Sequence, residues 1–375
     1  MPWVLERRLA PLQTRGAVLG AALAAVALAL LLCAGLFLLQ GVDPLAAYAS
    51  LLGEAFASER GIGYSIVQAT PLALIALGTI VAWRTGFAYL GFEGCFVIGA
   101  AACTATALLA RPGAALDGWP LAAMLPLCLL ASALAGALWA GVIGALRARY
   151  GGSEVLMSLM ANYIALLLVQ YLVAGPLRAP GGLPQSARLP AQTLLPLLMD
   201  GSRAHAGVFI ALAAAFAVWL LLRKTPVGYE MLLAGLSPRA ARYGGIPVTR
   251  RLLQAAMLAG AIGALAGLVQ VLGVQYRLID GMSGGIGFVG IVVALLARLD
   301  PLWVLLVAVL YGGMGVGADA MQRATGTPSS ITFILQALVV LLVLASPVAL
   351  RYRLRWRGWR ETAPAPKPLT EAEHG

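Results

Sequence analysis

The sequence predicts an all-α integral membrane protein with about ten transmembrane helices in two inverted repeats and both termini in the cytoplasm. Composition is the first observation behind this. Of the 375 residues, 61% are hydrophobic and only 11% are charged, whereas soluble domains average about 25% charged residues. The mean hydropathy is +0.89. The other two observations are a series of apolar segments of bilayer length and an internal repeat.

The apolar segments set the expected element order. A bilayer core is crossed by about 20 apolar residues in a helix. The candidate segments are 17–39, 64–83, 87–110, 120–146, 154–175, 207–222, 252–273, 286–297, 301–318 and 330–350. The eighth is short and flanked by glycine, so we expect a half-helix or a re-entrant piece there. Residues 17–350 then form one transmembrane domain, between a cytoplasmic N-terminus (1–16) and a basic cytoplasmic tail (351–375).

The distribution of basic residues supports this topology. With the N-terminus inside, most of the 26 Lys and Arg residues fall on the cytoplasmic side, as the positive-inside rule requires. They concentrate in a loop at 223–251 and in the tail. Removing one span would put that loop and the tail on opposite sides of the membrane. Trp356 and Trp359 in the tail favour an interfacial segment that lies on anionic lipid.

An internal repeat suggests how the helices are arranged. Residues 149–169 align without gaps on 323–343, and "GFEG" at 91–94 matches "GFVG" at 287–290. The topology places the two copies of each motif on opposite sides. Segments 2–5 (about 64–175) and 7–10 (about 252–350) are therefore predicted to be inverted repeats, a design of many transporters. Chance similarity between apolar segments is the alternative. The paired residues are Arg149 with Arg323, Gly152 with Gly326, Ser153 with Thr327, and Asn162 with Gln336.

Several functional classes find no support in the sequence. The net charge of +11 does not indicate nucleic-acid binding, because the arginines sit mostly at the ends of apolar segments. The spacing of the four cysteines matches no metal site, and two histidines form no zinc site or catalytic triad. No phosphate-binding glycine motif is present. We therefore expect no catalytic residue, metal or cofactor in this chain, and any ATP must be bound by a partner.

The stretch "GLSPRAARYGGIP" at 235–247 predicts a short, capped helix within the basic loop. Ser237 suits the N-cap, and Pro238 suits the first helical position, where a missing N–H costs nothing. Gly244 and Gly245 can adopt the left-handed conformation that ends a helix.

This helix has two possible roles. Arg239 and Arg242 lie three residues apart on one face, and the small Ala240 and Ala241 leave room for close packing. A helix this short is marginal alone. It is either an interfacial connector whose arginines face lipid headgroups or a coupling helix that docks on a cytoplasmic motor.

The stretch at 235–246, preceded by "RKTPVGYEMLLAG", resembles the cytoplasmic loop of ABC importer permeases of the branched-chain amino acid/simple sugar superfamily. The resemblance covers roughly residues 60–347. Further motifs look like the nucleoside-type branch of that superfamily. These are "ATPLALIALGTIVAWRTGFAYLGFEGCFVIGA" (69–100), "GGSEVLMSLMANYIALLLVQYLVAGPLR" (151–178), "GGIGFVGIVVALLARLDP" (284–301) and "MQRATGTPSS" (321–330).

The resemblance implies a function and partners. In that family two permease chains, often non-identical, pair with ATPase modules in the bacterial inner membrane. A lipid-anchored binding protein outside the cell delivers purine nucleosides; simple sugars are the next expectation. The resemblance also implies that the short helix receives the motion of the ATPase. Its residues would be Ser237, Pro238, Arg239, Ala240, Ala241, Arg242, Tyr243 and Gly244.

One motif departs from the family pattern. Members of the branch usually carry Asn-Ile-Gly-x-Glu-Gly-Gln, whereas residues 89–95 here are Tyr-Leu-Gly-Phe-Glu-Gly-Cys. Tyr89 and Cys95 thus replace two amides. If those amides contact the solute or shape the gate, the specificity of this chain differs from that of ordinary nucleoside permeases.

Within the same motif, Glu93 is the acidic residue expected at membrane depth. An intramembrane carboxylate is costly, which makes it a candidate for a functional site. Its partner would be Arg84 or a backbone amide in a glycine-rich bend. It is either a structural ion pair or helix cap, or a group that contacts the solute or the gate.

Four further residues are candidates for the solute pathway. Phe92 and Phe288 occupy matching repeat positions, where they would stack on a planar base or pack in the core. Asn162 and Gln336, also matched, would join helices by hydrogen bonds or line the pathway.

The main rival function is a proton-coupled secondary transporter with Glu93 as the proton carrier. It would explain the repeats and the carboxylate. It would not explain the capped helix at 237–243.

Overall fold

The computed structural model describes residues 3–7, 15–181, 183–198, 201–326, 328 and 330–356. The chain divides into two units, Met1–Cys33 with Ala337–Gly375, and Ala34–Gln336. Each unit is described by itself. The larger one carries every candidate site residue.

The predicted helical class is confirmed, because every predicted apolar segment contains a helix. Among the described residues, eight helices are long and apolar enough to cross a membrane, whereas α11 and the described part of α13 are shorter. The helices are α1 (Arg15–Leu39), α3 (Glu59–Arg84), α4 (Phe92–Ala107), α5 (Leu121–Tyr150), α6 (Glu154–Ala174), α7 (Gly207–Lys224), α10 (Val248–Gln270), α11 (Ile286–Leu296), α12 (Trp303–Thr325) and α13 (Ser330–Arg351).

Several shorter elements were not predicted from the sequence. Helix α2 (Pro44–Leu52) and a π-helical turn (Gly53–Ala57) precede α3, and α8 (Pro226–Leu236) precedes the expected short helix α9 (Pro238–Tyr243). In the smaller unit, β1 (Trp3–Arg7) pairs antiparallel with β2 (Tyr352–Trp356). The start of the tail expected on lipid is thus a strand, while Trp359 lies outside the described residues.

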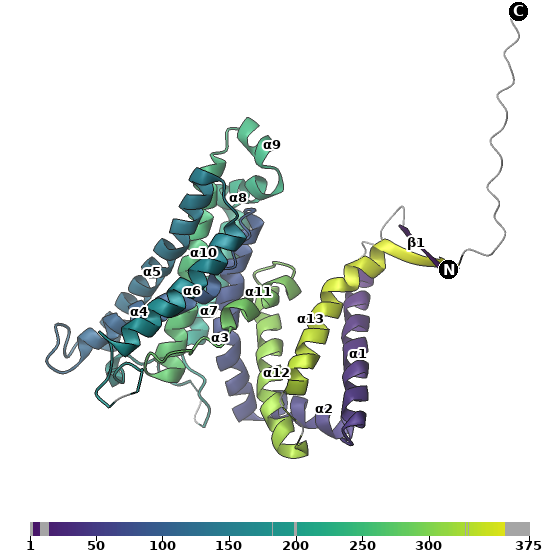
Figure 1. Cartoon of the computed structure of the whole chain (residues 1–375), viewed down its shortest axis with the longest axis horizontal. Coiled ribbons are helices and arrows are strands. Elements are labelled where there is room, and N and C mark those ends of the chain that lie inside the picture. The colour runs from purple at the N-terminus through teal and green to yellow at the C-terminus, as the bar shows by residue number, and fades with distance from the viewer. Residues whose placement is uncertain are drawn as a thin grey trace, which may run out of the picture. The chain divides into compact units, whose positions relative to one another are not determined.

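The core of the larger unit is built around α3, α4 and α10 (Figure 1). Nearly every side chain of α3 from Val67 to Ala82 is buried, so this helix has no broad face left for lipid. Glycines allow the neighbouring helices to approach closely. A Cβ on Gly260 of α10 would strike the carbonyl of Gly136 on α5, and a Cβ on Gly136 would strike that of Gly260. Such small residues are typical of helix crossings in membranes.

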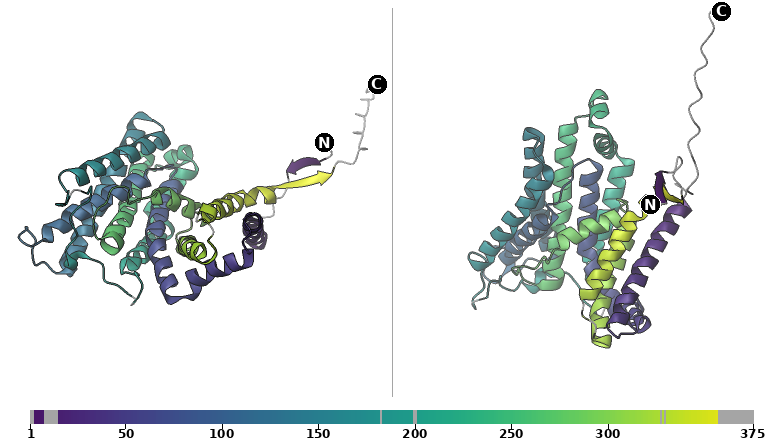
Figure 2. Two further views of the ribbon diagram at one scale, coloured as in Figure 1. Left: turned by 60° about the horizontal axis from the view of Figure 1, so that its bottom comes forward. Right: turned by 45° about the vertical axis from the view of Figure 1, so that its right-hand side comes forward.

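The outer helices present apolar side chains to the bilayer. On α5, exposed residues recur every fourth position, which places them on one face of the helix. Figure 2 shows α5 at the edge of the bundle. These residues are Leu130, Leu134, Leu138 and Val142, each at least 60% exposed. A soluble protein would not leave such a stripe in water.

The helix ends correct one detail of the predicted repeat. Gly151 (φ 69°) follows the last residue of α5 and Gly326 (φ 69°) follows the last residue of α12, and both glycines are left-handed C-caps. The gap-free alignment paired Gly326 with Gly152 instead. The structural match therefore pairs Gly326 with Gly151, one residue earlier. This pairing keeps the left-handed glycine that ends both helices. Thr327 lies outside the described residues.

The close crossing of α5 and α10 leads to a stability prediction. Gly260→Ala should lower the melting temperature of the detergent-solubilised protein, because overpacking a tight contact costs about 1–3 kcal/mol. Gly16→Ala, where an added Cβ meets nothing within 4 Å, is the matched control and should change little. Equal melting temperatures for both variants would contradict the crossing.

The loop between α6 and α7 (residues 175–206) packs on the end of α10. Backbone hydrogen bonds join Ser186 to Leu278 and Leu195 to Leu272. His205 ends this loop and is 1% exposed; its Nδ1 accepts a hydrogen bond from the N–H of Gly207 at 3.1 Å. Burial lowers the pKa of His205 from 6.5 to about 4, because the charged imidazolium loses its solvation.

The lowered pKa of His205 predicts a pH-dependent stability. Below about pH 6.5 the unfolded chain takes up a proton that the folded chain refuses until about pH 4. Stability is therefore complete above this window and falls as the pH drops through it, by about 1.4 kcal/mol per unit. His205→Asn keeps an acceptor but does not titrate. The fall in melting temperature between pH 7 and pH 5 should shrink in this variant, and an unchanged fall would count against the buried imidazole.

Candidate functional site

The first candidate site is a junction where two helices begin. Glu93 is the second residue of α4 and is 4% exposed. Its Oε1 accepts a hydrogen bond from the N–H of Gly285 at 3.1 Å, and its Oε2 accepts one from Gly287 at 2.8 Å. These amides open α11. One carboxylate thus lies between the positive ends of two helix dipoles.

The two helices leave this junction in opposite directions. Helix α4 leads to Ala110, whose carbonyl accepts a hydrogen bond from Gln192 in the 175–206 loop. Helix α11 leads to Asp300, which forms an ion pair of 2.7 Å with Arg223 at the end of α7. The 175–206 loop leads into the start of α7, whereas Arg223 lies at the end of α7. Helices α4 and α11 therefore run toward opposite membrane faces.

The structure settles which partner holds Glu93. It is a pair of backbone amides, one of the two expected options, and no ion pair with Arg84 occurs among the described residues. Glycine is required at 287 by the close approach, because a Cβ there would strike the backbone of Glu93. The sequence signal was the run "GGIG" at 284–287, whose link to Glu93 across the chain could not be inferred.

Polar side chains of α6 hold the start of α4. Asn162 accepts a hydrogen bond from the N–H of Gly94 at 2.8 Å and donates one to the carbonyl of Leu90 at 3.0 Å. One turn earlier, Ser158 accepts from the N–H of Leu90 at 3.1 Å. Asn162 therefore joins two helices, the first of its two expected roles. Ser158 was not singled out from the sequence.

The two departures from the family motif touch each other. The hydroxyl of Tyr89 lies 3.1 Å from the Sγ of Cys95 and donates to the carbonyl of Gly91. Both side chains are fully buried. The Tyr89 ring is stacked on Phe87 and meets Phe92 edge-on. Tyr89 and Cys95 thus act as a matched pair that packs the turn before α4.

The two phenylalanines proved not to be equivalent. Phe92 is the first residue of α4, is fully buried, and wedges between Gly78 on α3 and Gly263 on α10. Phe92 therefore packs in the core, the second of its two expected roles. Phe288 is the third residue of α11 and is 43% exposed. Gln336 is buried on α13.

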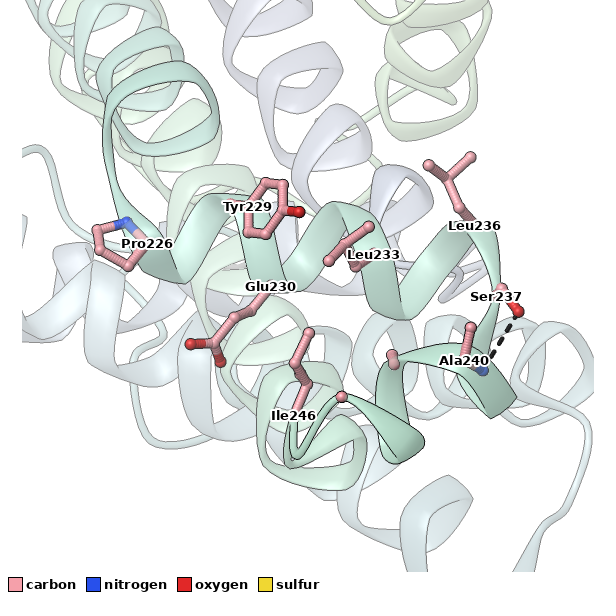
Figure 3. Close-up of a pocket in the computed structure, with 10 residues that line it drawn as sticks. Pro226, Tyr229, Glu230, Leu233, Leu236, Ser237, Ala240 and Ile246 are labelled. Atoms are coloured by element: carbon pink, nitrogen blue, oxygen red, sulfur yellow. Dashed lines mark hydrogen bonds between the residues drawn. The ribbon is translucent and has the colours of Figure 1, made fainter.

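The second candidate site is a groove between α8 and α9 (Figure 3). The predicted cap is confirmed: Ser237 Oγ accepts from the N–H of Ala240 at 3.4 Å, with Pro238 following it. At the other end only Gly245 is left-handed, with φ 79°, whereas Gly244 has φ −77°. The N–H of Ile246 donates to Ala241 and that of Gly245 to Arg242. These paired bonds stop the helix.

The groove has a volume of about 470 Å³ and is open to solvent. Ala240 is exposed on its rim, whereas Ala241 is 3% exposed and faces the protein. The expectation that both alanines leave room for a partner is therefore wrong for Ala241. Tyr243 is 95% exposed. The groove is lined by Pro226, Tyr229, Glu230, Leu233, Leu236, Ser237, Ala240, Ala241, Gly244 and Ile246.

Two contacts anchor the groove to the bundle. Glu230 of α8 forms an ion pair of 2.6 Å with Arg251, in the first turn of α10. The backbone of Gly235 packs directly on the turn between α3 and α4 at Arg84 and Gly86. Among the described residues, no three His, Cys, Asp or Glu side chains are grouped to hold a metal ion.

Comparison with known proteins adds to this geometry. The family described as the branched-chain amino acid transport system permease component matches residues 61–344. The guanosine ABC transporter permease protein of Bacillus subtilis is 34% identical, over 87% of this chain and 93% of its own length. A glucose ABC transporter permease protein of Haloferax volcanii is 35% identical, over 84% and 83%. A nucleoside ABC transporter permease protein of Lactococcus lactis is 29% identical, over 86% and 89%. No solved structure matches.

The helices, the lipid-facing stripe and the capped groove define a multi-pass membrane permease. The chain belongs to the family of branched-chain amino acid transport system permease components. It is the permease subunit of an ABC transporter, so ATP hydrolysis belongs to a partner chain. Such permeases work with an ATPase and a substrate-binding component. The proton-coupled carrier finds no support.

The junction leads to a prediction for Glu93. Glu93→Gln replaces one acceptor oxygen by an NH₂ that faces a backbone N–H, so it should destabilise the protein by about 1–3 kcal/mol. A lower melting temperature would show this. Glu59→Gln makes the same change at an exposed position in the first turn of α3 and should have little effect. A variant at Glu93 as stable as wild type would refute the shared cap.

Proposed function

We propose that this chain is the membrane subunit of an ATP-driven importer for purine nucleosides or related neutral polar solutes, with simple sugars next. The supporting observation is the groove between α8 and α9, which offers a docking surface for an ATPase. Membership of the permease family adds to this support. Its relatives are named for guanosine, nucleosides and glucose. The guanosine permease matches over 93% of its length, which favours nucleosides without excluding sugars.

Helix α9 is proposed as the coupling helix. Its exposed face carries Arg239, Ala240, Arg242 and Tyr243. These residues offer two positive charges and one aromatic ring to a surface of the ATPase. The caps at Ser237 and Gly245 hold the helix in place without that partner. The ATPase would approach most closely at Ala240, because its small side chain leaves room there. A larger side chain at this position would project from the rim into the partner.

Motion of α9 has a direct route to the junction. Helix α8 shares the groove with α9 and touches the α3–α4 turn through Gly235. That turn continues through Tyr89 into α4 and Glu93. Helix α10 is tied to α8 by the Arg251–Glu230 pair. A push on α9 would therefore reach both the start of α4 and the start of α10.

The opposed helices α4 and α11 support the proposal of inverted repeats at about 64–175 and 252–350. Transporters of this design move one half against the other around a central site. Glu93 joins the two halves, and Asn162 holds the first of them. Phe288 and Gln336 are proposed to lie along the pathway. No cofactor is proposed for this chain, and ATP is proposed to be bound by the partner.

The remaining partners are also proposals. A second, non-identical permease chain would complete the pathway. A solute-binding lipoprotein would deliver the solute at the face opposite α9. The basic loop at 223–251 favours the cytoplasmic side for α9, and the bacterial inner membrane is the proposed location.

Uptake of radiolabelled guanosine by proteoliposomes tests the function. The vesicles hold this chain with its ATPase, second permease and binding protein, and the assay compares ATP with a proton gradient. Accumulation that needs ATP is the expected result. Accumulation driven by the proton gradient without the ATPase would contradict the proposal.

The coupling helix is tested in the same assay by Ala240→Glu. A carboxylate on the rim should clash with the ATPase and lower ATP-driven uptake at least about tenfold, a loss of 1.4 kcal/mol or more in coupling. Ala115→Glu makes the same change at an exposed site in the turn between α4 and α5 and should transport normally. Ala241→Glu is unsuitable, because Ala241 is buried. Normal transport by the Ala240 variant would exclude α9 as the coupling helix.

A further inference from the structure

The chain that precedes α11 crosses part of the membrane without forming a helix. On one side, Leu278 exchanges hydrogen bonds with Ser186 in the 175–206 loop. On the other side, α11 begins at the Glu93 junction and ends near the Arg223–Asp300 pair. Its 11 residues span about 16 Å, half of a hydrocarbon core of about 30 Å. Residues 280–285 must bridge much of the remainder.

Part of the backbone of this 280–285 segment is exposed and unpaired, although Gly284 and Gly285 donate hydrogen bonds to Gly281 and Glu93. Asp280, Gly281 and Gly284 are exposed, and a Cβ added at Gly281, Gly284 or Gly285 would meet nothing within 4 Å. No other described residue accepts a hydrogen bond from the N–H groups of residues 280–283. The neighbouring Phe288 exposes 43% of its surface on the same stretch.

Lipid cannot cover such a segment. Each unpaired backbone group costs several kcal/mol in hydrocarbon, so irregular backbone at membrane depth is found only inside protein or beside water. The lipid-facing stripe of α5 shows the contrast, because its backbone is fully helical and its exposed residues are Leu and Val.

The charges around the segment restrict what it can bind. The positive pole of α11 is already matched by the carboxylate of Glu93. Asp280 adds a further negative charge, bonded at 3.2 Å to Gln170 of α6. Residues 280–285 themselves carry no positive charge, and the nearest basic residue along the chain is Arg277. The segment therefore offers mainly backbone donors and acceptors, which suits hydroxyl-bearing neutral solutes better than phosphates and carboxylates.

We propose that residues 280–285 and Phe288 line the water-filled solute pathway and bind a neutral, hydroxyl-rich solute through backbone groups and the Phe288 ring. This inference rests on the proposed function and names the part of the chain that contacts the solute. Glu93 acts here as a built-in counter-charge that removes the anion preference of a bare helix N-terminus. Phosphorylated forms of the solute are excluded from the pathway.

Water access to the segment can be measured with single cysteines. Met282→Cys and Phe288→Cys are placed in a chain whose four native cysteines, all buried, are changed to Ala, and the assembled complex is treated with a charged methanethiosulfonate. Leu134→Cys, on the lipid-facing stripe at 61% exposure, is the control. Labelling at 282 and 288 should be at least about tenfold faster than at 134, because only a hydrated thiol ionises and reacts.

A second set of labelling experiments, with solutes added, shows whether the hydrated segment lies along the solute pathway. Labelling is repeated with guanosine, glucose or guanosine monophosphate, and uptake of each is measured on the same preparation. The solute that the complex accumulates should slow labelling at 288, and guanosine monophosphate should not. Labelling as slow as at Leu134→Cys would overturn the proposal, and so would fast labelling that an accumulated solute leaves unchanged. A complex that accumulates neither guanosine nor glucose would contradict the proposed function alone. The rates of labelling at 282 and 288 relative to 134 would still show whether the segment is in contact with water.

Discussion

The carboxylate of Glu93 is the interaction on which the arrangement of this permease depends. A helix that begins inside a membrane leaves backbone N–H groups with no water to bind. Here two helices begin at one place, and a single side chain satisfies amides of α11 from within the first turn of α4. Asn162 performs the matching task for α4. The Glu93 carboxylate allows α11 to begin within the membrane as a half-helix. It also allows α4 and α11 to point in opposite directions, with an open segment before α11.

The same junction connects the pathway to the surface that meets the ATPase. Close backbone contacts, which do not deform easily, join α8 to the turn before α4. Small residues make those contacts possible, and they also let α5 and α10 cross at Gly136 and Gly260. A bundle packed in this way transmits a displacement as a rigid shift instead of absorbing it in side chains. The exposed α9 is then the natural place for a motor to act.

Much of the fold could be predicted from the sequence, because membrane spans are marked by length and apolarity, which are local properties. The caps of α9 were equally local: Ser237 and the two glycines specify them within a few residues. The site was harder. The bond between Glu93 and Gly287 joins residues 194 positions apart, and no periodicity reveals such a pair. Phe92 and Phe288 looked equivalent in alignment but start their helices at different positions. Tyr89 and Cys95 looked like two independent replacements of amide side chains, but in the structure they contact each other. The short strands near the two ends of the chain carried no hydrophobic signal that separated them from basic tails.

The most direct test of the central claim is a photo-crosslink from α9 in the assembled, ATP-dependent complex. A benzophenone amino acid at Tyr243, which is 95% exposed, should form an adduct with the ATPase subunit, and its yield should change when ATP is bound. The same probe at Tyr163, exposed on α6, should yield no such adduct. An ATPase adduct from Tyr243 would place α9 at the motor interface. Its absence from an assembled and active complex would show that the motor drives this permease from another surface.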